Sequence, residues 1–403
     1  MISFAEPAIQ QCPFGAYEKL RRESPVYHDP VTGNFVLTRY EDVRKTLLNT
    51  RIFSSRNGLG GTRSIPETDA IFDSRGWRPM DTLISNDPPE HRHYRTLVDK
   101  AFAPARVKNM EGAIAAMVEN LIDDFIDRSE VEFVAEFAIK LPMIIIAAQL
   151  SVAASDMDRF KLWSDISVES MDPAMSKERQ IEVVTELTNM QQYMAAAIER
   201  LTAQPDDSLL SHLIQAEVDG ERLGMGALQN IVQQLLVAGN ETTTMALAAG
   251  IKMMIDRPEL VEEMRADPGL IPRFVEEVLR IMAPVQTLFR KVTEDTEIGG
   301  VAIPAGSMVE VRFGAANLDP AIYERPDELD LHRTGRSAHM SFGAGPHLCI
   351  GNQLARGELR IAFEAIMRRM DNLRPSRGEE SFAYTPLYIS HGLTRLWLAF
   401  DKR

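Results

Sequence analysis

A cysteine lies in a glycine-rich loop directly ahead of a helical pattern. Residues Phe342–Gly351 have the sequence Phe-Gly-Ala-Gly-Pro-His-Leu-Cys-Ile-Gly. After this loop, apolar residues recur at helical spacing at Leu354, Ala355, Leu359, Ala362, Ile366 and Met370. Cys349 therefore precedes a helix N-terminus, where unpaired N–H groups and the helix dipole favour a thiolate over a thiol. A thiolate in an apolar loop suits a haem iron as a strong electron-donating axial ligand. A buried structural cysteine and a covalent nucleophile are the alternatives.

The other loop residues suit a flat cofactor. Gly343 and Gly345 allow backbone angles that other residues avoid, and Gly351 would let the chain approach a macrocycle closely. Phe342 would shield the sulfur from water. The pattern Phe-x-x-Gly-x-x-x-Cys-x-Gly resembles the haem-binding loop of the cytochrome P-450 family at every fixed position. The resemblance implies that Cys349 is the ligand of haem b, iron protoporphyrin IX.

The resemblance covers most of the 403 residues and implies a single domain, 1–403. The family fold is mainly α-helical with small peripheral β-sheets. Its haem is sandwiched between a long distal helix and the helix of the cysteine loop. The sequence itself shows no linker, charge block or internal repeat that would mark a second domain.

A long apolar helical pattern over residues 226–256 has a polar centre. Ala238 to Thr244 have the sequence Ala-Gly-Asn-Glu-Thr-Thr-Thr, where a buried helix would favour leucine. Polar residues inside a strong element often mark a functional site. The segment resembles the family's oxygen-activation motif, which implies that Thr242 hydrogen-bonds oxygen at the haem and Glu241 relays protons. The small Ala238 would leave room beside the cofactor. A polar kink with Glu241 at the surface is the structural alternative.

Glu277 and Arg280 are three residues apart and share one face of a predicted helix. They resemble the family's Glu-x-x-Arg motif, which implies a buried charge network with Arg333 that holds the scaffold of the cysteine loop. The same spacing occurs elsewhere in the chain, so order along the sequence selects this pair.

Two haem propionates require cations and hydrogen-bond donors. In Asp87-Pro-Pro-Glu-His-Arg-His-Tyr-Arg95, His91 and Arg95 are four residues apart and face the same way. The resemblance assigns both to the propionates, together with Arg290 and His347. Solvated surface charge is the alternative for each.

The substrate wall that the family resemblance implies is mainly apolar. Its residues would be Met80, Leu83, Gln234, Val237, Ala238, Val285, Leu288 and Tyr388. Such a lining indicates a small or medium hydrophobic organic substrate. Arg78, in Trp-Arg-Pro, is similar to a loop arginine of bacterial members that oxidise para-substituted benzoates, and would bind a carboxylate. Asp81 would repel that carboxylate, so terpenoids, steroids and polyketides remain alternatives.

Composition restricts the partners and the compartment. A net charge of −14 and a pI near 5.2 argue against nucleic acid as a partner. The two cysteines, Cys12 and Cys349, fit a reducing cytosol. The N-terminus has no signal-peptide pattern, and the apolar stretch 141–150 is too short to cross a membrane. We therefore expect a cytoplasmic protein that does not bind membranes. A monomer is also expected.

Few residues follow the cysteine, so we expect electrons to come from separate proteins. The resemblance implies a ferredoxin and a flavin-dependent NAD(P)H reductase. An acidic ferredoxin would require a local basic face, and the candidates are Arg92, Lys100, Arg106, Lys108, Arg336 and Arg356. Scattered surface charges are the alternative.

These residues together predict a monooxygenase that inserts one oxygen atom from O2 into a C–H bond, by hydroxylation or oxidative O-dealkylation. One alternative is a peroxide-driven haem-thiolate oxygenase, although such members usually lack the acid–threonine pair. Another is a haem-based sensor or carrier, for which no regulatory or DNA-binding module is visible. A nucleophilic Cys349 would lack a base.

Elements that position these residues are expected as follows. The patterns predict a hairpin over 26–37, a long loop over 55–80, helices from 90 to 285, strands at 297–303 and 308–313, an irregular stretch over 314–340, a helix after Cys349, and a strand-like segment at 386–400. The helices should break near Pro142, Pro173, Pro205 and Pro258.

Overall fold

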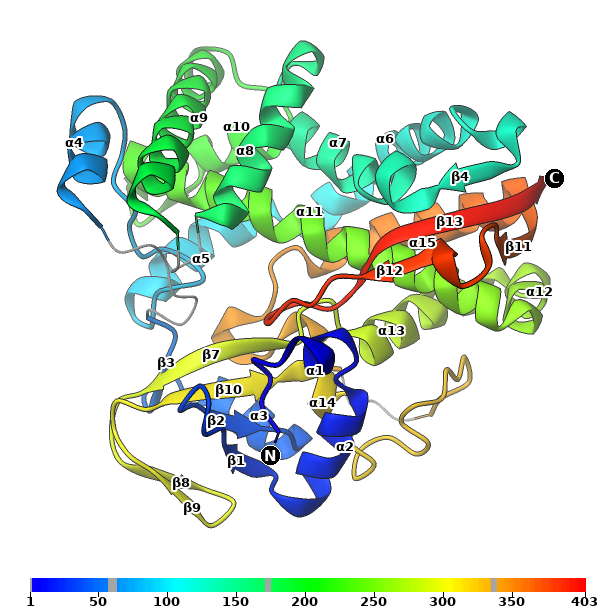
Figure 1. Ribbon diagram of the computed structural model, residues 1–403. Helices are drawn as coiled ribbons and strands as arrows, with labels where there is room; N and C mark the ends of the chain where they lie inside the picture. Colours follow the sequence, from blue (N-terminus) through cyan, green and yellow to red (C-terminus); the bar gives the residue numbers. More distant parts are fainter. Residues whose placement is uncertain (1, 57–63, 171–174, 335–338) are drawn as a thin grey trace. The chain divides into compact units, whose positions relative to one another are not determined.

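The computed structural model describes residues 2–56, 64–170, 175–334 and 339–403. The chain divides into two compact units. Figure 1 labels the helices and strands. The first unit comprises Met1–Ser54, Val107–Pro142 and Glu241–Arg403, and the second comprises Ser55–Arg106 and Met143–Asn240. One boundary lies within helix α7 (Lys140–Gln149) and another within helix α11 (Met225–Asp256), which contributes residues to both units.

The first unit holds the cysteine loop and most of the strands. Its helices of four or more residues, apart from α7 and α11, are α1 (Pro7–Gln11), α2 (Phe14–Glu23), α3 (Tyr40–Leu48), α6 (Pro104–Asp123, largely in this unit), η2 (a π-helix, Val134–Ala138), α12 (Pro258–Ala266), α13 (Ile271–Met282), α14 (Phe313–Ala316), α15 (Asn352–Arg369) and η7 (Gly378–Ser381). Shorter 3-10 turns are η1 (Ile126–Arg128), η4 (Pro268–Leu270), η5 (Met340–Phe342) and η6 (Gly345–His347). The last two lie in the cysteine loop.

A five-stranded sheet supports this loop. Its strands, in spatial order, are β1 (Val26–His28), β2 (Phe35–Leu37), β10 (Met308–Arg312), β7 (Thr287–Val292) and β3 (Phe53–Ser54). Strand β10 is parallel to β2 and antiparallel to β7. Leu37, Val309 and Val311 form an apolar cluster under the sheet, and Met340 and Ala344 of the cysteine loop pack into the same cluster. The loop is thus fastened to the sheet core.

Two smaller sheets complete the strands of the first unit. A four-stranded sheet contains β11 (Met370–Pro375), β12 (Phe382–Tyr384), β13 (Leu393–Lys402) and β4 (Glu130–Glu132). A hairpin pairs β8 (Thr296–Ile298) with β9 (Val301–Ile303). All strands of the four-stranded sheet pair through β13, which therefore ties the C-terminus to β4.

Helices α11, α13 and α15 pack closely in the first unit. Phe274 of α13 meets Phe363 of α15 edge-on, with ring centroids 5.3 Å apart. On α11, a Cβ atom at Gly250 would lie 2.2 Å from the Phe363 ring. Only glycine allows α11 to come this near, because a side chain there would overlap the ring.

The second unit is mainly helical. Besides its parts of α7 and α11, its elements are α4 (Pro66–Arg75), α5 (Glu90–Ala101), η3 (Ala154–Asp156), α8 (Met157–Glu169), α9 (Lys177–Ala203), α10 (Leu209–Gln215), β5 (Glu217–Val218) and β6 (Glu221–Arg222). Helix α9 contacts α4, α8 and α10, and α10 contacts α5 (Figure 1). Ser176 caps α9 by accepting a hydrogen bond from the Arg179 backbone N–H at 3.3 Å.

Most of the expected elements are present. The hairpin near the N-terminus, the long helix, the strands around 297–313 and the helix after the cysteine are confirmed. The loop predicted over 55–80 is wrong in part, because α4 forms there. Pro66 begins this helix, and the Thr68 hydroxyl accepts from the Ile65 N–H at 3.2 Å. Strand β7 is also absent from the prediction, and residues 386–392 are irregular rather than extended. Pro173 lies outside the described residues.

The apolar stretch 141–150 forms helix α7, with Leu141 and Leu150 buried. No helix in the described ranges combines the length and the apolar character needed to cross a membrane.

Glu358, in α15, is a buried acid with 4% of its surface exposed. Among the described residues its Oε2 atom has no hydrogen-bond partner. Burial raises the pKa of Glu358 to about 8, because the charged form loses its hydration. Between about pH 4.5 and pH 8, Glu358 therefore stays protonated in the folded protein but releases its proton in the unfolded chain.

This proton makes stability depend on pH. The free energy of unfolding should fall as the pH rises from about 4.5 to about 8, by roughly 3 to 5 kcal/mol. Glu358→Gln has no proton to lose, so its stability relative to the wild type should grow over the same interval. Urea unfolding at pH 5.5 and 8.5 measures this difference, with Glu364→Gln on the same helix as the control. An equal difference at both pH values would contradict a protonated Glu358.

Candidate functional site

The cysteine loop folds back on itself between two 3-10 turns. Gly343 and Gly345 have φ angles of 69° and 70°, in the left-handed region that favours glycine. The backbone N–H of Cys349 donates to the carbonyl of Phe342 at 2.8 Å, which closes the loop. The side-chain amide of Asn352, the first residue of α15, donates to the Cys349 carbonyl at 2.6 Å. The cysteine is thus fixed from both sides at the start of α15.

Gly345 and Gly351, on either side of the cysteine, differ in whether the protein itself requires glycine. A Cβ atom at Gly345 would lie 3.0 Å from the carbonyl oxygen of Leu47, so the loop approaches α3 closely there. Gly351 has an ordinary φ of −80°, and a Cβ atom there would meet no protein atom within 4 Å. Neither backbone strain nor packing within the protein requires glycine at 351.

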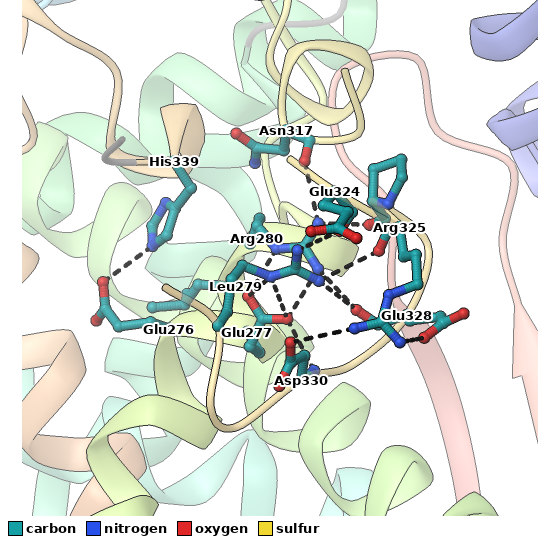
Figure 2. A network of polar contacts seen from close by, with 12 residues as sticks. Glu276, Glu277, Leu279, Arg280, Asn317, Glu324, Arg325, Glu328, Asp330 and His339 are labelled. Carbon is teal, nitrogen blue, oxygen red and sulfur yellow. Dashed lines mark hydrogen bonds and ion pairs between the residues drawn. The ribbon is translucent and has the colours of Figure 1, made fainter. Parts of the chain in front are cut away.

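A buried charge network lies beside the loop (Figure 2). Arg280 donates to both carboxylate oxygens of Glu277, at 2.7 Å from Nε and 2.8 Å from Nη2. Arg333 lies 3.2 Å from the same carboxylate. The side chains are 7% exposed at Glu277, 3% at Arg280 and 14% at Arg333. One carboxylate therefore faces two guanidinium groups in a region with little water.

Backbone carbonyls absorb the remaining donors of the two arginines. Arg280 donates to the carbonyls of Asn317, Pro326 and Glu328. Arg333 donates to those of Glu324, Arg325 and Glu328. The irregular stretch before the cysteine loop is thereby shaped around the two guanidinium groups, which accounts for its lack of periodic pattern.

Asn317 connects this network to the cysteine loop. Its carbonyl accepts from Arg280 at 3.1 Å, while its side-chain oxygen accepts from the Met340 N–H at 2.5 Å. Its side-chain amide donates to the Ser341 hydroxyl at 2.8 Å, and that hydroxyl donates to the Leu279 carbonyl at 2.6 Å. Asn317 is not among the site residues expected from the sequence, because no periodicity or spacing links it to the cysteine loop.

The polar centre of α11 spans both units. The helix is continuous from Met225 to Asp256, so the polar segment does not end it. Ala238, Gly239 and Glu241 are exposed and Thr242 is half-buried, whereas the neighbouring residues on either side are largely buried. In the first unit, Thr244 donates to the carbonyl of Ala138 in η2 at 2.9 Å. This contact fixes the helix one half-turn after Thr242.

The predicted propionate ligands fall into two pairs. In the second unit, His91 is buried in α5, and burial followed by the charge of Arg95 lowers its pKa. Arg95 pairs with Asp99 at 2.8 Å and keeps 21% of its side chain exposed. In the first unit, Arg290 is buried on β7, and His347 is half-buried in η6.

Two predicted wall segments meet in the first unit. The backbone N–H of Gln286 donates to the Ile389 carbonyl at 2.7 Å, and Val285 forms a bridge with Ser390. Val285 and Leu288 therefore adjoin the turn that carries Tyr388. The ring of Tyr388 stacks on Phe289 at 5.9 Å.

The hydroxyl of Tyr388 is committed to a buried pair. It donates to Glu310, which in turn pairs with Arg312, and both charged side chains are at most 2% exposed. The Arg312 guanidinium also covers the Phe4 ring at 3.9 Å. Tyr388 is therefore held by the hydrogen bond from its hydroxyl to Glu310 and by the stacking of its ring on Phe289.

The remaining wall residues belong to the second unit. Gln234 accepts from the Ile84 N–H at 3.3 Å and donates to the Thr82 hydroxyl at 2.6 Å, so it fastens the loop around Leu83 to α11. Met80 is 40% exposed, and Leu83 and Val237 are half-buried. Arg78 forms a bidentate pair with Asp73, at 2.7 and 2.6 Å, and lies 3.4 Å from Asp69. Two carboxylates already balance its charge.

The residues present fit a haem. Cys349 is exposed and forms no disulfide. A Cβ atom at Gly351 would meet no protein atom within 4 Å, so packing within the protein does not require glycine there. The same holds for Gly239, which is exposed on α11. A thiol, small residues on exposed backbone and basic side chains are the groups that an iron macrocycle with two carboxylates requires, and the first unit contributes Cys349, Arg290 and His347 among them.

Comparisons with known proteins agree with this chemistry. A sequence model of the family described as Cytochrome P450 matches residues 174–387. Cytochrome P450 107B1 from Saccharopolyspora erythraea is 33% identical over 398 residues, which cover 97% of this chain and 96% of that protein. The steroid C26-monooxygenase of Mycobacterium tuberculosis is 33% identical over 385 residues, covering 96% and 93%. The solved structure of cytochrome P450 CYP109Q5 from Chondromyces apiculatus has a TM-score of 0.86 at 32% identity, covering 100% of this chain and 98% of that chain.

The charge network at Glu277 yields a test of its own. Glu277→Gln leaves two largely buried guanidinium groups without a counter-charge, and should lower the free energy of unfolding by about 3 to 5 kcal/mol. Glu328→Gln removes only an exposed pair with Arg325, whose atoms lie 2.9 Å apart, and should cost less than about 1 kcal/mol. Urea unfolding of both variants measures the difference. An equal loss in the free energy of unfolding for both variants would show that the Glu277 network contributes no more to stability than an exposed ion pair.

Proposed function

Because the chain belongs to the cytochrome P450 family of haem-binding monooxygenases, we propose that it inserts one oxygen atom from O2 into a C–H bond of a neutral hydrophobic substrate. The cysteine loop carries this proposal, since an exposed thiol is fixed at a helix start beside a buried charge network. Both units would act as one catalytic domain.

Haem b, when bound, supplies the iron that activates O2. We assign its ligand to the Sγ atom of Cys349, which the bonds from Cys349 N–H to Phe342 and from Asn352 to the Cys349 carbonyl hold in place. The N-terminal dipole of α15 would favour the thiolate. Phe342 would keep water from the sulfur, and Gly351 would leave room for the flat ring.

The propionates would be held by two histidines and two arginines. His91 and Arg95 are four residues apart on α5, and Arg290 and His347 belong to the first unit. Arg290 is the more deeply buried of the two arginines, with 5% exposure, and burial would strengthen its hydrogen bonds to a carboxylate.

Protons would reach the oxygen side along α11. The exposed carboxylate of Glu241 would take them from solvent, and the half-buried hydroxyl of Thr242 would hand them on. Ala238 would line the cofactor face. The bond from Thr244 to the Ala138 carbonyl supports this arrangement by holding the helix in register.

A neutral substrate suits the wall better than an aromatic acid. Arg78, the candidate for binding a carboxylate, already pairs with Asp73 and Asp69 on an exposed surface. A substrate carboxylate would have to compete with both. The wall residues Val285, Leu288, Met80 and Leu83 are apolar. A substrate of steroid type, as the name of the Mycobacterium tuberculosis relative indicates for that protein, would match them.

Electrons would come from a ferredoxin and a flavin-dependent NAD(P)H reductase in the cytoplasm. Arg92, Lys100 and Lys108 are exposed and would offer cations to an acidic partner. Arg356 keeps 31% of its side chain exposed but pairs with Glu276. Arg336 lies outside the described residues.

The proposed ligand can be tested with carbon monoxide. The reduced protein with carbon monoxide should show the strongly red-shifted Soret band of thiolate-ligated haem. Cys349→Ala should lose that band, whereas Cys12→Ala, at the other cysteine, should keep it. The band of histidine-ligated haem in the freshly purified wild type, or its red-shifted band surviving in Cys349→Ala, would rule out this ligand.

The proposed reaction can be tested with labelled oxygen. With ferredoxin, reductase and NADH under 18O2, a neutral steroid that shifts the haem spin state should gain one labelled oxygen atom. Thr242→Ala should divert NADH consumption to hydrogen peroxide, because the proton path is interrupted. Product formation that needs added peroxide and takes no label from O2 would favour the peroxide-driven reaction. Spin-state shifts with benzoates alone would contradict a neutral substrate.

A further inference from the structure

The ring of Phe342 contacts the side chains of Arg356 and His339. The guanidinium carbon of Arg356 lies 4.4 Å from the ring centroid. The His339 ring lies 5.6 Å away, tilted by 39°. Arg356 comes from α15 and His339 directly precedes η5, so side chains from both ends of the cysteine loop converge on this ring.

A single carboxylate holds both of these side chains. Glu276 on α13 accepts two hydrogen bonds from Arg356, at 2.6 Å from Nε and 3.0 Å from Nη2. Its Oε2 atom also lies 3.3 Å from Nε2 of His339. A dashed line marks this contact in Figure 2. We call Glu276, His339, Arg356 and Phe342 the proximal clamp.

Hydrogen bonding fixes the orientation of His339. Its Nδ1 atom accepts a hydrogen bond from the Ser341 backbone N–H at 3.3 Å. The His339 side chain is 5% exposed, which leaves it little freedom to rotate. The imidazole therefore links the backbone of the loop to α13.

The carboxylate of Glu276 stays ionised at neutral pH. Burial on its own would raise the pKa of Glu276, but its interactions with His339 and Arg356 outweigh burial and lower the pKa to about 2. Bidentate guanidinium–carboxylate geometry is more rigid than an ordinary surface pair. Arg356 is thus held over the Phe342 ring by its pair with Glu276.

Movement of Phe342 would reach the sulfur by a short path. The carbonyl of Phe342 accepts the N–H of Cys349 at 2.8 Å, and Gly343 turns the chain immediately after the ring. A ring that swings away would let water approach the thiolate. Water donating hydrogen bonds to the sulfur would weaken its electron donation to the iron and raise the reduction potential.

We propose that Glu276 is a positioning residue which, through Arg356 and His339, holds Phe342 against the cysteine loop and so sets the electron donation of Cys349. This inference rests on the proposed role of Cys349 as haem ligand. It assigns a function to the acid directly before Glu277, which the Glu-x-x-Arg motif does not include.

Charge-preserving substitution separates positioning from simple electrostatics. Arg356→Lys keeps the positive charge but loses the flat cover and the bidentate pair. The clamp predicts a higher reduction potential, by about 59 mV for a tenfold change in the equilibrium of one-electron uptake. Through-space charge alone predicts no change. Arg356→Met should also raise the potential if the clamp acts, whereas removal of a positive charge should otherwise lower it.

The double variant gives a second criterion. Glu276→Gln alone raises the potential under either view. If both residues act through Phe342, the reduction potential of the Glu276→Gln/Arg356→Met double variant should be as high as those of the single variants. If two opposite charges merely cancel, its reduction potential should return towards that of the wild type. Arg360→Met is the matched control, one turn further along α15, where the cation pairs with Glu111 and Glu364.

The measurement is a spectroelectrochemical titration of each holoprotein, with the carbon monoxide spectrum recorded beside it. Higher potentials in Arg356→Lys and Arg356→Met, with Arg360→Met unchanged or lower, support the clamp. An unchanged Arg356→Lys or a lowered Arg356→Met overturns it, provided that the thiolate Soret band is present. Absence of that band from the wild type would instead overturn the proposed function.

Discussion

The carboxylate of Glu277 between Arg280 and Arg333 is the interaction on which the cysteine loop depends. A buried charge is costly unless each of its partners is placed well, so this network tolerates few arrangements. Both guanidinium groups use their remaining donors on backbone carbonyls of the irregular stretch. Segments without their own secondary structure are thereby given one conformation. Asn317 then passes that conformation to Met340 and Ser341 through side-chain hydrogen bonds. The buried carboxylate of Glu277 thus fixes the backbone of the irregular stretch, and that backbone fixes the loop that carries Cys349.

Apolar packing supplies what the charge network cannot, namely a fixed distance between helices. Gly250 lets α11 press against Phe363 of α15, and Phe274 of α13 meets the same ring. Three helices therefore share one aromatic side chain within the first unit. At the exposed position Gly239 of the same helix α11, stability alone would favour a better helix former than glycine.

How much the sequence could predict depended on whether a signal was local. The cysteine loop, the long helix and the helix after Cys349 follow from spacing within one segment, and all were expected from it. Helix α4 was missed because a short polar helix has little amphipathic pattern. Asn317 and Glu276 act on residues far away in sequence, and no periodicity reveals such pairs. The exposed ion pairs of Arg78 depend on where Asp73 and Asp69 fall after folding.

Glu276 and Glu277 show how one turn of helix can serve two purposes. Adjacent residues on an α-helix point about 100° apart, so these two carboxylates face different neighbours. Glu277, at 7% side-chain exposure, turns to the irregular stretch and fixes backbone. Glu276, at 43%, turns to His339 and Arg356 and fixes side chains around Phe342. The backbone of the cysteine loop and the side chains around the Phe342 ring are therefore both held by contacts to one helix, α13. Any shift of that helix would move both together, which keeps the relation between thiol and ring constant.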